Sequence, residues 1–355
     1  MKDINLSPYI EDTKENLTKV VSKFSETWKE FEDFLTFLKT DIAQKIVLLI
    51  WWDQISGSLS PFMHTYSSYK NDNPFLYTLF KMTKEQRELK EIFEYIKSDE
   101  NILWANVTMP YKIEIFQILS DLGLLDESAK LVWAVNTIAK QNWEVLGYNT
   151  DMYGILEPIK EKLGLKLQSV KKWYVLWAWW AARAAIAALL KLGIQDITIF
   201  NRTDENMIKL VNHFNSKEVK EILKWCFSLK MVEYDIQYDD KSNISEHIDD
   251  TWILINTLPF GFKSHFSKYP IREWEFDKVF DKIKLYFDVV YDMNYDCTPM
   301  IGYIKENYQD IAICDWIDMV VEQAKKWFKM WSDGNVIDWE KIKKIFRWKN
   351  NINTK

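Results

Sequence analysis

The side chains that could do chemistry lie in four short polar segments. The segments are Ser58-Leu59-Ser60-Pro61, Asn106-Val107-Thr108-Met109-Pro110-Tyr111-Lys112, Ala134-Val135-Asn136-Thr137 and Gly147-Tyr148-Asn149-Thr150-Asp151. A lysine and an aspartate can hold or transfer a proton, and the hydroxyls and amides around them can hydrogen-bond a polar molecule. Taken singly, each segment is also typical of a capped turn, and Lys112 of a solvated surface lysine. Only their combination indicates a binding site.

The elements that must position these segments alternate between strands and helices. From residue 173 the chain reads WYVL, then an alanine-rich helix AARAAIAALLKLG, then DITIF ending in Asn201-Arg202-Thr203. This succession is a βαβ unit. Further apolar runs predict strands at 45–50 (KIVLLI), 252–256 (WILIN) and 286–291 (YFDVVY). The fold class is therefore α/β.

Helices are predicted at both ends of the chain. Apolar residues recur with a helical period between Ile10 and Leu38, which predicts a helical N-terminal extension. The charged stretch 81–101 predicts a solvated helix, after which the segment from Asn106 begins the next element beyond a loop. The chain is expected to finish with helices around 316–331 and 338–347.

Length and composition exclude several classes of protein. The 355 residues are enough for two domains, because single cores stop growing near roughly 250–300 residues. A net charge of -6 argues against a nucleic-acid partner. No apolar run reaches the roughly 18 residues of a membrane span, and the N-terminus is too polar for a signal peptide, so we expect a cytoplasmic protein with no membrane partner. Three scattered cysteines and four scattered histidines predict neither a disulfide framework nor a metal site.

In this order and spacing, the polar segments resemble the motifs of the shikimate dehydrogenase family over residues 45–335. The resemblance implies that Lys112 is the catalytic acid-base group and that Asp151 is its partner. It also implies a set of substrate-binding residues: Ser58 and Ser60 for the carboxylate of shikimate, and Thr108, Asn136, Tyr291 and Gln323 for the rest of the ring. Oxidising a ring hydroxyl requires a hydride to leave carbon while a proton leaves oxygen, which is why such a site needs an acid-base group.

The resemblance also implies the domain organisation. Residues 1–40 would be the helical extension, and residues 41–150 the shikimate-binding catalytic domain, completed by the C-terminal helices at 313–355. Residues 151–312 would form a Rossmann-like domain that binds NADP. We expect a monomer or a homodimer whose small-molecule partner is shikimate or 3-dehydroshikimate.

The cofactor turn resembles the family sequence G-A-G-G-A-A-R-A, but tryptophan stands at its glycine positions. The implied cofactor-binding residues are Trp177, Ala178, Trp179, Trp180 and Ala181 at the pyrophosphate, Asn201, Arg202 and Thr203 at the adenosine 2'-phosphate, and Trp316. Arg202 would favour NADP by charge-assisted hydrogen bonds. Asp204 could instead accept from an unphosphorylated ribose, so NAD remains the alternative. The segment from Ile255 to Gly261 resembles the family's loop near the nicotinamide.

The tryptophans need a common explanation. The chain has 18 tryptophans and 9 glycines, and eight tryptophans stand where the family has glycine: 52, 104, 133, 143, 177, 179, 180 and 316. Taken literally, an indole in the turn would fill the phosphate site, where glycine lets the backbone approach the pyrophosphate. Because one residue type recurs and its neighbours are intact, we interpret the pattern as UGA codons that the organism reads as glycine. Trp331 fits a family tryptophan, and the other nine are unassigned.

The predicted function is therefore the NADPH-dependent reduction of 3-dehydroshikimate to shikimate in aromatic amino acid biosynthesis. A quinate/shikimate dehydrogenase that uses NAD shares the same motifs. If the tryptophans are real, a non-catalytic relative that binds a small molecule is the third alternative.

Overall fold

The computed structural model describes sixteen stretches of the chain, and the statements below concern them. They are residues 4–25, 29, 31–40, 45–51, 58–71, 73–82, 86–141, 144–170, 172–177, 180–202, 204–235, 242–248, 253–258, 269–289, 298–331 and 337–352. Within these stretches no helix is long and apolar enough to cross a membrane.

The chain forms two compact units. The first contains residues 1–149 and 327–342, and the second contains residues 150–326 and 343–355. The N-terminal extension thus belongs to the first unit. The C-terminal helices, expected as a whole with the substrate-binding domain, are divided between the two units.

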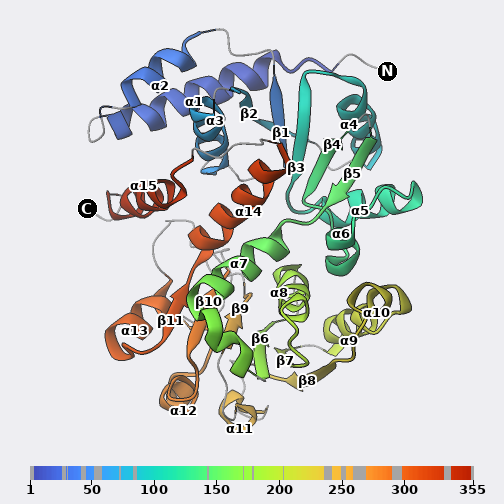
Figure 1. Ribbon diagram of the computed structural model, residues 1–355, viewed down its shortest axis with the longest axis vertical. Helices are drawn as coiled ribbons and strands as arrows, with labels where there is room; N and C mark the ends of the chain where they lie inside the picture. Colours follow the sequence, from blue (N-terminus) through green and yellow to red (C-terminus); the bar gives the residue numbers. More distant parts are fainter. Residues whose placement is uncertain are drawn as a thin grey trace. The chain divides into compact units, whose positions relative to one another are not determined.

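The first unit is built on a five-stranded mixed sheet (Figure 1) with the strand order β2-β1-β3-β4-β5. Its strands are β1 (Ile46–Trp51), β2 (Leu76–Lys81), β3 (Ile102–Val107), β4 (Thr137–Gln141) and β5 (Glu144–Tyr148). The strands β2, β1 and β3 are parallel, and Ile50 is in register with both Phe80 and Val107. The strands β4 and β5 continue the sheet in antiparallel fashion. Asn106 is the second-last residue of β3, whereas the sequence pattern predicted that it begins an element after a loop.

Four helices of the described chain belong with this sheet. They are α3 (Ser60–Lys70), α4 (Gln86–Ser98), α5 (Lys112–Asp121) and α6 (Glu127–Val132). Three of them, α3, α4 and α5, each follow one of its parallel strands. One core cluster joins Leu48 and Ile50 of β1 to apolar residues of α4 and α5. The position where α5 starts is thus fixed by a buried core.

The N-terminal extension forms α1 (Ser7–Ser25) and α2 (Phe31–Leu38), as its periodicity predicts. Its apolar face packs on α3: Phe24 and Phe31 lie 4.9 and 5.8 Å from the ring of Phe62. Thr13 also accepts a hydrogen bond from the backbone N-H of Leu79 in the edge strand β2, at 3.3 Å. The extension therefore supports the helix that begins with Ser60.

The second unit is built on a six-stranded parallel sheet with the order β11-β10-β9-β6-β7-β8. Its strands are β6 (Lys172–Leu176), β7 (Asp196–Asn201), β8 (Ser228–Glu233), β9 (Ile253–Asn256), β10 (Leu285–Asp288) and β11 (Ala312–Cys314). Read from β8, this is the 3-2-1-4-5-6 order of a dinucleotide-binding fold, whose order reverses between β6 and β9. The expected α/β fold with a Rossmann-like domain is confirmed.

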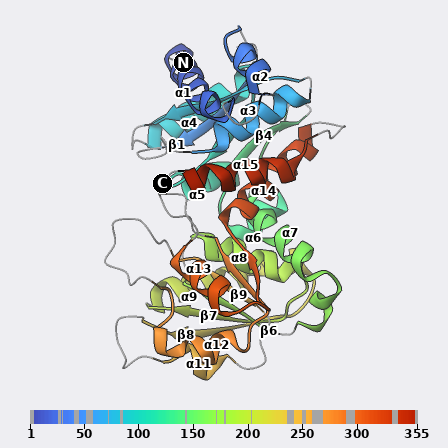
Figure 2. The ribbon, with the colours of Figure 1, turned by 90° about the vertical axis from the view of Figure 1, so that its left-hand side faces the viewer.

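Helices lie on both faces of the second sheet, and Figure 2 shows α11 and α12 on one side and α8 on the other. The elements are α7 (Asp151–Leu163), η1 (Gly164–Ser169), α8 (Trp180–Lys191), α9 (Asp204–Phe214), α10 (Lys217–Leu223), α11 (Ile244–His247), η2 (Glu273–Glu275), α12 (Phe276–Phe280) and α13 (Pro299–Asn307). The last two helices are α14 (Trp316–Trp331) and α15 (Trp339–Ile352). Tyr174 and Leu176 of β6 share a core cluster with residues of α11, α12 and α13.

Candidate active site

In the first unit, the predicted site residues meet at the carboxyl ends of β1 and β3. The backbone N-H of Thr108 donates to the carbonyl of Ile50 at 3.1 Å, and that of Val107 to the carbonyl of Asn136 at 2.8 Å. The carbonyl of Lys112 accepts from the N-H of Val135 at 2.9 Å. Thr108, Lys112 and Asn136 are therefore tied to one edge of the sheet, where open α/β sheets bind ligands.

Ser58 and Ser60 lie at the same edge, where the chain enters α3. The hydroxyl of Ser58 accepts from the backbone N-H of Ser60 at 3.3 Å, and both residues are half-buried. Pro61 occupies the first turn of α3, where its missing N-H costs no helical hydrogen bond. Two hydroxyls at a helix N-terminus suit a carboxylate.

Two buried rings support this edge, and neither belongs to a motif identified from the sequence. The hydroxyl of Tyr77 donates to Oδ1 of Asn106 at 3.0 Å and contacts the side chain of Ser60. Asn106 in turn donates to Oγ1 of Thr137 at 2.9 Å. Burial raises the pKa of Tyr77, so its proton stays on and the ring acts as a donor.

The second ring is His64, one turn after Ser60 on α3. It stacks on Tyr77 with ring centroids 4.6 Å apart and is 4% exposed. Burial lowers the pKa of His64 to about 3, so the imidazole is neutral near pH 7. His64 therefore packs beneath the site as an uncharged ring.

In the second unit, Asp151 and Gln323 form a direct hydrogen bond. Gln323 on α14 donates from Nε2 to Oδ1 of Asp151, the first residue of α7, at 2.9 Å. The two helices are closely packed there, because a Cβ on Gly154 would lie 2.6 Å from the carbonyl oxygen of Met319. A predicted catalytic residue and a predicted substrate-binding residue are thus brought together from 172 positions apart. Lys112 and Asp151, the predicted acid-base pair, belong to different units.

Trp177, the first residue of the predicted cofactor turn, directly follows β6, which lies beside β9 where the strand order of the second sheet reverses. Thr257, just after β9, donates from Oγ1 to the carbonyls of Leu176 and Trp177 at 2.8 and 2.9 Å. Beside it, the buried Asp288 accepts from Asn256 and Thr298 at 3.1 and 2.7 Å. These bonds fix the ends of β6, β9 and β10 at the place where dinucleotides bind in this topology.

The other predicted cofactor residues are distributed as follows. Asn201 is buried at the end of β7, and Arg202 after it is exposed. Ala181 is half-buried in the first turn of α8, and Trp316 is 8% exposed at the start of α14. Ala178, Trp179, Thr203 and Tyr291 lie outside the described residues, and of Trp180 only the backbone is described.

Three non-glycine residues of the described chain have a positive φ, and two are tryptophans at predicted glycine positions. They are Trp177 at 73°, Trp133 at 56° and Lys224 at 61°. Residues other than glycine rarely adopt this backbone conformation. The backbone at Trp177 thus fits a nucleotide-binding turn, whereas an indole on it does not, since the diphosphate must approach the backbone closely. The turn fits NADP or NAD only if glycine occupies positions 177, 179 and 180.

Comparison with known proteins identifies relatives along most of the chain. Residues 50–138 match the family described as the shikimate dehydrogenase substrate binding domain. A shikimate dehydrogenase (NADP(+)) of Nitrosopumilus maritimus is 31% identical over 280 residues, which are 79% of this chain and 90% of that protein. Another, of Caldanaerobacter subterraneus, is 30% identical over 312 residues, covering 86% of this chain and 99% of that protein.

Solved structures of shikimate dehydrogenases also resemble this chain. Shikimate dehydrogenase of Aquifex aeolicus is 26% identical with a TM-score of 0.63, over 86% of this chain and 97% of that one. Shikimate 5-dehydrogenase of Listeria monocytogenes, solved with shikimate and NAD, is 26% identical with a TM-score of 0.66, over 85% of this chain and 96% of that one.

Proposed function

Because this chain belongs to the shikimate dehydrogenase family, we propose that it catalyses the reversible, NADP-linked reduction of 3-dehydroshikimate to shikimate in aromatic amino acid biosynthesis. The observation that carries the proposal is the grouping of Ser60, Thr108, Lys112 and Asn136 at one sheet edge. All four lie within residues 50–138, which match the substrate binding domain of the family.

Each side chain has a role that its chemistry supports. Ser58 and Ser60 donate hydrogen bonds to the carboxylate of shikimate, and Asp151 and Gln323 hold its ring hydroxyls. Lys112 holds the proton of the hydroxyl that is oxidised. Thr108, Asn136 and Tyr291 complete the polar contacts to the ring. When bound, the nicotinamide supplies the hydride acceptor or donor.

The second unit supplies the cofactor site of this proposal. The N-H groups at the start of α8 bind the diphosphate, and Asn201, Arg202 and Thr203 bind the 2'-phosphate of NADP. The curated relatives are named for NADP(+). The Listeria protein was solved with NAD, so NAD is the alternative cofactor. A quinate/shikimate dehydrogenase that uses NAD is then the alternative function.

We further propose that the native protein has glycine at positions 52, 104, 133, 143, 177, 179, 180 and 316. The positive φ of Trp133 and Trp177 supports this, because both positions have the backbone conformation that favours glycine. Trp104 gives no such support: it is 1% exposed and stacks on Trp327 at 5.2 Å, so its glycine assignment rests on the motif.

The coding DNA tests the glycine proposal. UGA at positions 177, 179 and 180 with UGG at 331 is the expected result. UGG at all four positions would overturn the proposal and, because the turn could not take a dinucleotide, the dehydrogenase function with it.

Steady-state kinetics test the function in the chain with glycine at the eight positions, called the glycine form below. The rates are measured with shikimate and quinate, each with NADP and NAD. The proposal expects the highest kcat/KM for shikimate with NADP. A preference for quinate and NAD would identify the alternative dehydrogenase, and turnover with none of the four pairs would contradict the function.

A further inference from the structure

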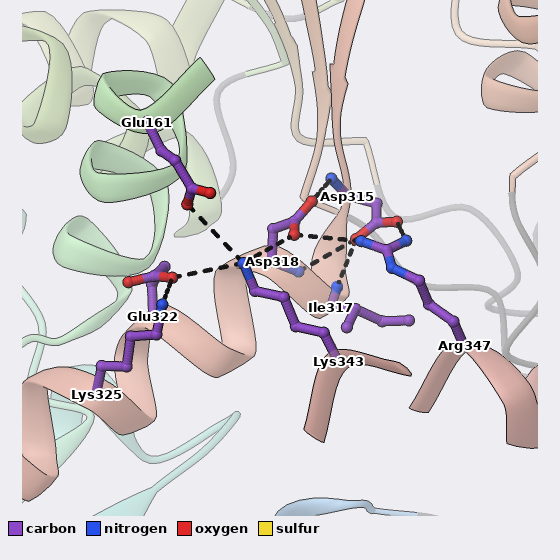
Figure 3. A network of polar contacts seen from close by, with 8 residues as sticks. All are labelled: Glu161, Asp315, Ile317, Asp318, Glu322, Lys325, Lys343 and Arg347. Atoms are coloured by element: carbon purple, nitrogen blue, oxygen red, sulfur yellow. Dashed lines mark hydrogen bonds and ion pairs between the residues drawn. The ribbon is translucent and has the colours of Figure 1, made fainter. Parts of the chain in front are cut away.

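A network of charged residues joins α7 to the parts of α14 and α15 that belong to the second unit (Figure 3). The carboxylates are Glu161 of α7, Asp315 just before α14, and Asp318 and Glu322 of α14; the cations are Lys325 of α14 and Lys343 and Arg347 of α15. None of them belongs to the motifs on which the proposed function rests, and none is a tryptophan.

The centre of the network is the ammonium group of Lys343. It lies 3.4 Å from Asp318, 3.6 Å from Glu322 and 3.9 Å from Glu161. The side chain of Lys343 is only 8% exposed, and those of Asp318 and Glu322 are 9% and 7% exposed. Burying a charge is unfavourable unless it is paired, so these contacts depend on one another.

Arg347 extends the network to the start of α14. Its guanidinium binds both Asp315 and Asp318. Asp315 caps α14, accepting from the backbone N-H groups of Ile317 and Asp318 at 3.1 Å each. Burial alone would lower the pKa of Arg347, but the two carboxylates raise it above its usual value. One face of α15 thus holds both the cap and the first turns of α14.

The same two helices, α7 and α14, carry Asp151 and Gln323. The two helices pack closely at Gly154, which lies against Met319 and Gln323. Glu161 is seven residues beyond Gly154, about 10 Å further along the helix. There Lys343 contacts Glu161 of α7 as well as Asp318 and Glu322 of α14, which links the two helices at a second point.

We propose that Lys343 is a positioning residue that joins α7 to α14 and thereby holds Asp151 against Gln323. This inference rests on the proposed function, since it assigns a purpose to the Asp151–Gln323 pair in binding shikimate. Lys343 itself touches neither substrate nor cofactor in this assignment.

The test compares variants of the glycine form. Lys343→Met is expected to raise KM for shikimate roughly five- to twentyfold with little change in KM for NADP, and to lower Tm by roughly 5–15 °C. Lys343→Arg keeps the charge and is expected to restore most of the affinity. Lys344→Met, at an exposed neighbour on α15, is the matched control and should change neither value.

A double-mutant cycle separates positioning from general stability. If Lys343 acts through the Asp151–Gln323 pair, Lys343→Met adds little to KM once Gln323 is alanine. The inference would be overturned if Lys343→Met and Gln323→Ala multiplied KM independently, or if Lys343→Met left KM unchanged.

Two further measurements keep the inference testable if Lys343→Met fails to fold or if the parent has no activity. Glu161→Gln removes only the link to α7, at a side chain that is 58% exposed, and should raise KM two- to fivefold. Hydrogen exchange of Asp151–Leu163 needs no substrate and should be faster in Glu161→Gln than in the parent. If the parent has no turnover, the proposed function is contradicted. If Glu161→Gln changes neither the hydrogen exchange of Asp151–Leu163 nor KM for shikimate, the inference about Lys343 is contradicted.

Discussion

The amide of Gln323 donates a hydrogen bond to the carboxylate of Asp151 at 2.9 Å, joining α14 to the first residue of α7. Hydrogen bonds to charged groups contribute about 1.5–3 kcal/mol. The carbonyl oxygen of the Gln323 side chain can accept a hydrogen bond from a hydroxyl group. In the proposed function, this bond orients Asp151 and Gln323 toward the hydroxyls of the substrate ring.

Replacing Gln323 tests this role. We expect Gln323→Ala to raise KM for shikimate roughly tenfold or more, because a bond to the ring and the orientation of Asp151 are both lost. KM for NADP should not change. Gln309→Ala, at an exposed glutamine of the same unit, is the control in the same kinetic assay.

Gly154 tests the close packing of α7 on α14. A Cβ there would lie 2.6 Å from the carbonyl oxygen of Met319 and 2.8 Å from Cγ of Gln323. Gly154→Ala should destabilise the protein by about 1–3 kcal/mol and raise KM for shikimate. Gly302→Ala, in a helix with no atom within 4 Å of the added Cβ, should stabilise it by about 0.5–1 kcal/mol. Thermal unfolding of both variants would show opposite shifts in Tm, and equal shifts would contradict the packing argument.

Lys112 tests the acid-base assignment. Lys112→Ala in the glycine form should lower kcat by about 10²–10⁴-fold, the usual contribution of a positioned acid-base group. Lys97→Ala, at an exposed lysine in the last turn of α4, should leave kcat unchanged. Near-normal turnover in Lys112→Ala would show that another group handles the proton.

His64 gives the protein a specific dependence of stability on pH. Its pKa is about 3 in the folded protein, against about 6.5 when unfolded, so between these values the unfolded chain binds more protons. The stability due to the neutral ring is complete above pH 6.5 and is lost as the pH falls, by about 1.4 kcal/mol per unit. The free energy of unfolding, measured with denaturant, should fall between pH 7 and pH 5 by about 2 kcal/mol more in the parent than in His64→Phe. The phenylalanine keeps a ring against Tyr77. Parallel losses in the two proteins would contradict this account.

Much of the fold could be predicted from local pattern. The apolar run predicted as a strand at 45–50 forms β1, and the βαβ unit predicted from residue 173 forms β6, α8 and β7. The strands β3 and β8 were not predicted, because polar residues interrupt their apolar runs, and β11 has only three residues. Their positions depend on pairing with β1, β7 and β10.

The candidate site was predicted where it consists of motifs and missed where it consists of tertiary contacts. Tyr77 reaches Asn106 across 29 positions, and Lys343 reaches Asp318 from another helix. In the sequence these are an ordinary strand tyrosine and one lysine among several on a charged helix. Only packing shows that the tyrosine is buried against the site and that the lysine is surrounded by carboxylates.

We propose above all that this chain is an NADP-linked shikimate dehydrogenase with glycine at positions 177, 179 and 180 of its cofactor turn. The most direct measurement is the initial rate of NADP reduction by shikimate, for the glycine form beside the tryptophan form. The account predicts turnover by the glycine form and neither NADP binding nor turnover by the tryptophan form. Two folded proteins that both fail to oxidise shikimate or quinate with NADP or NAD would contradict it.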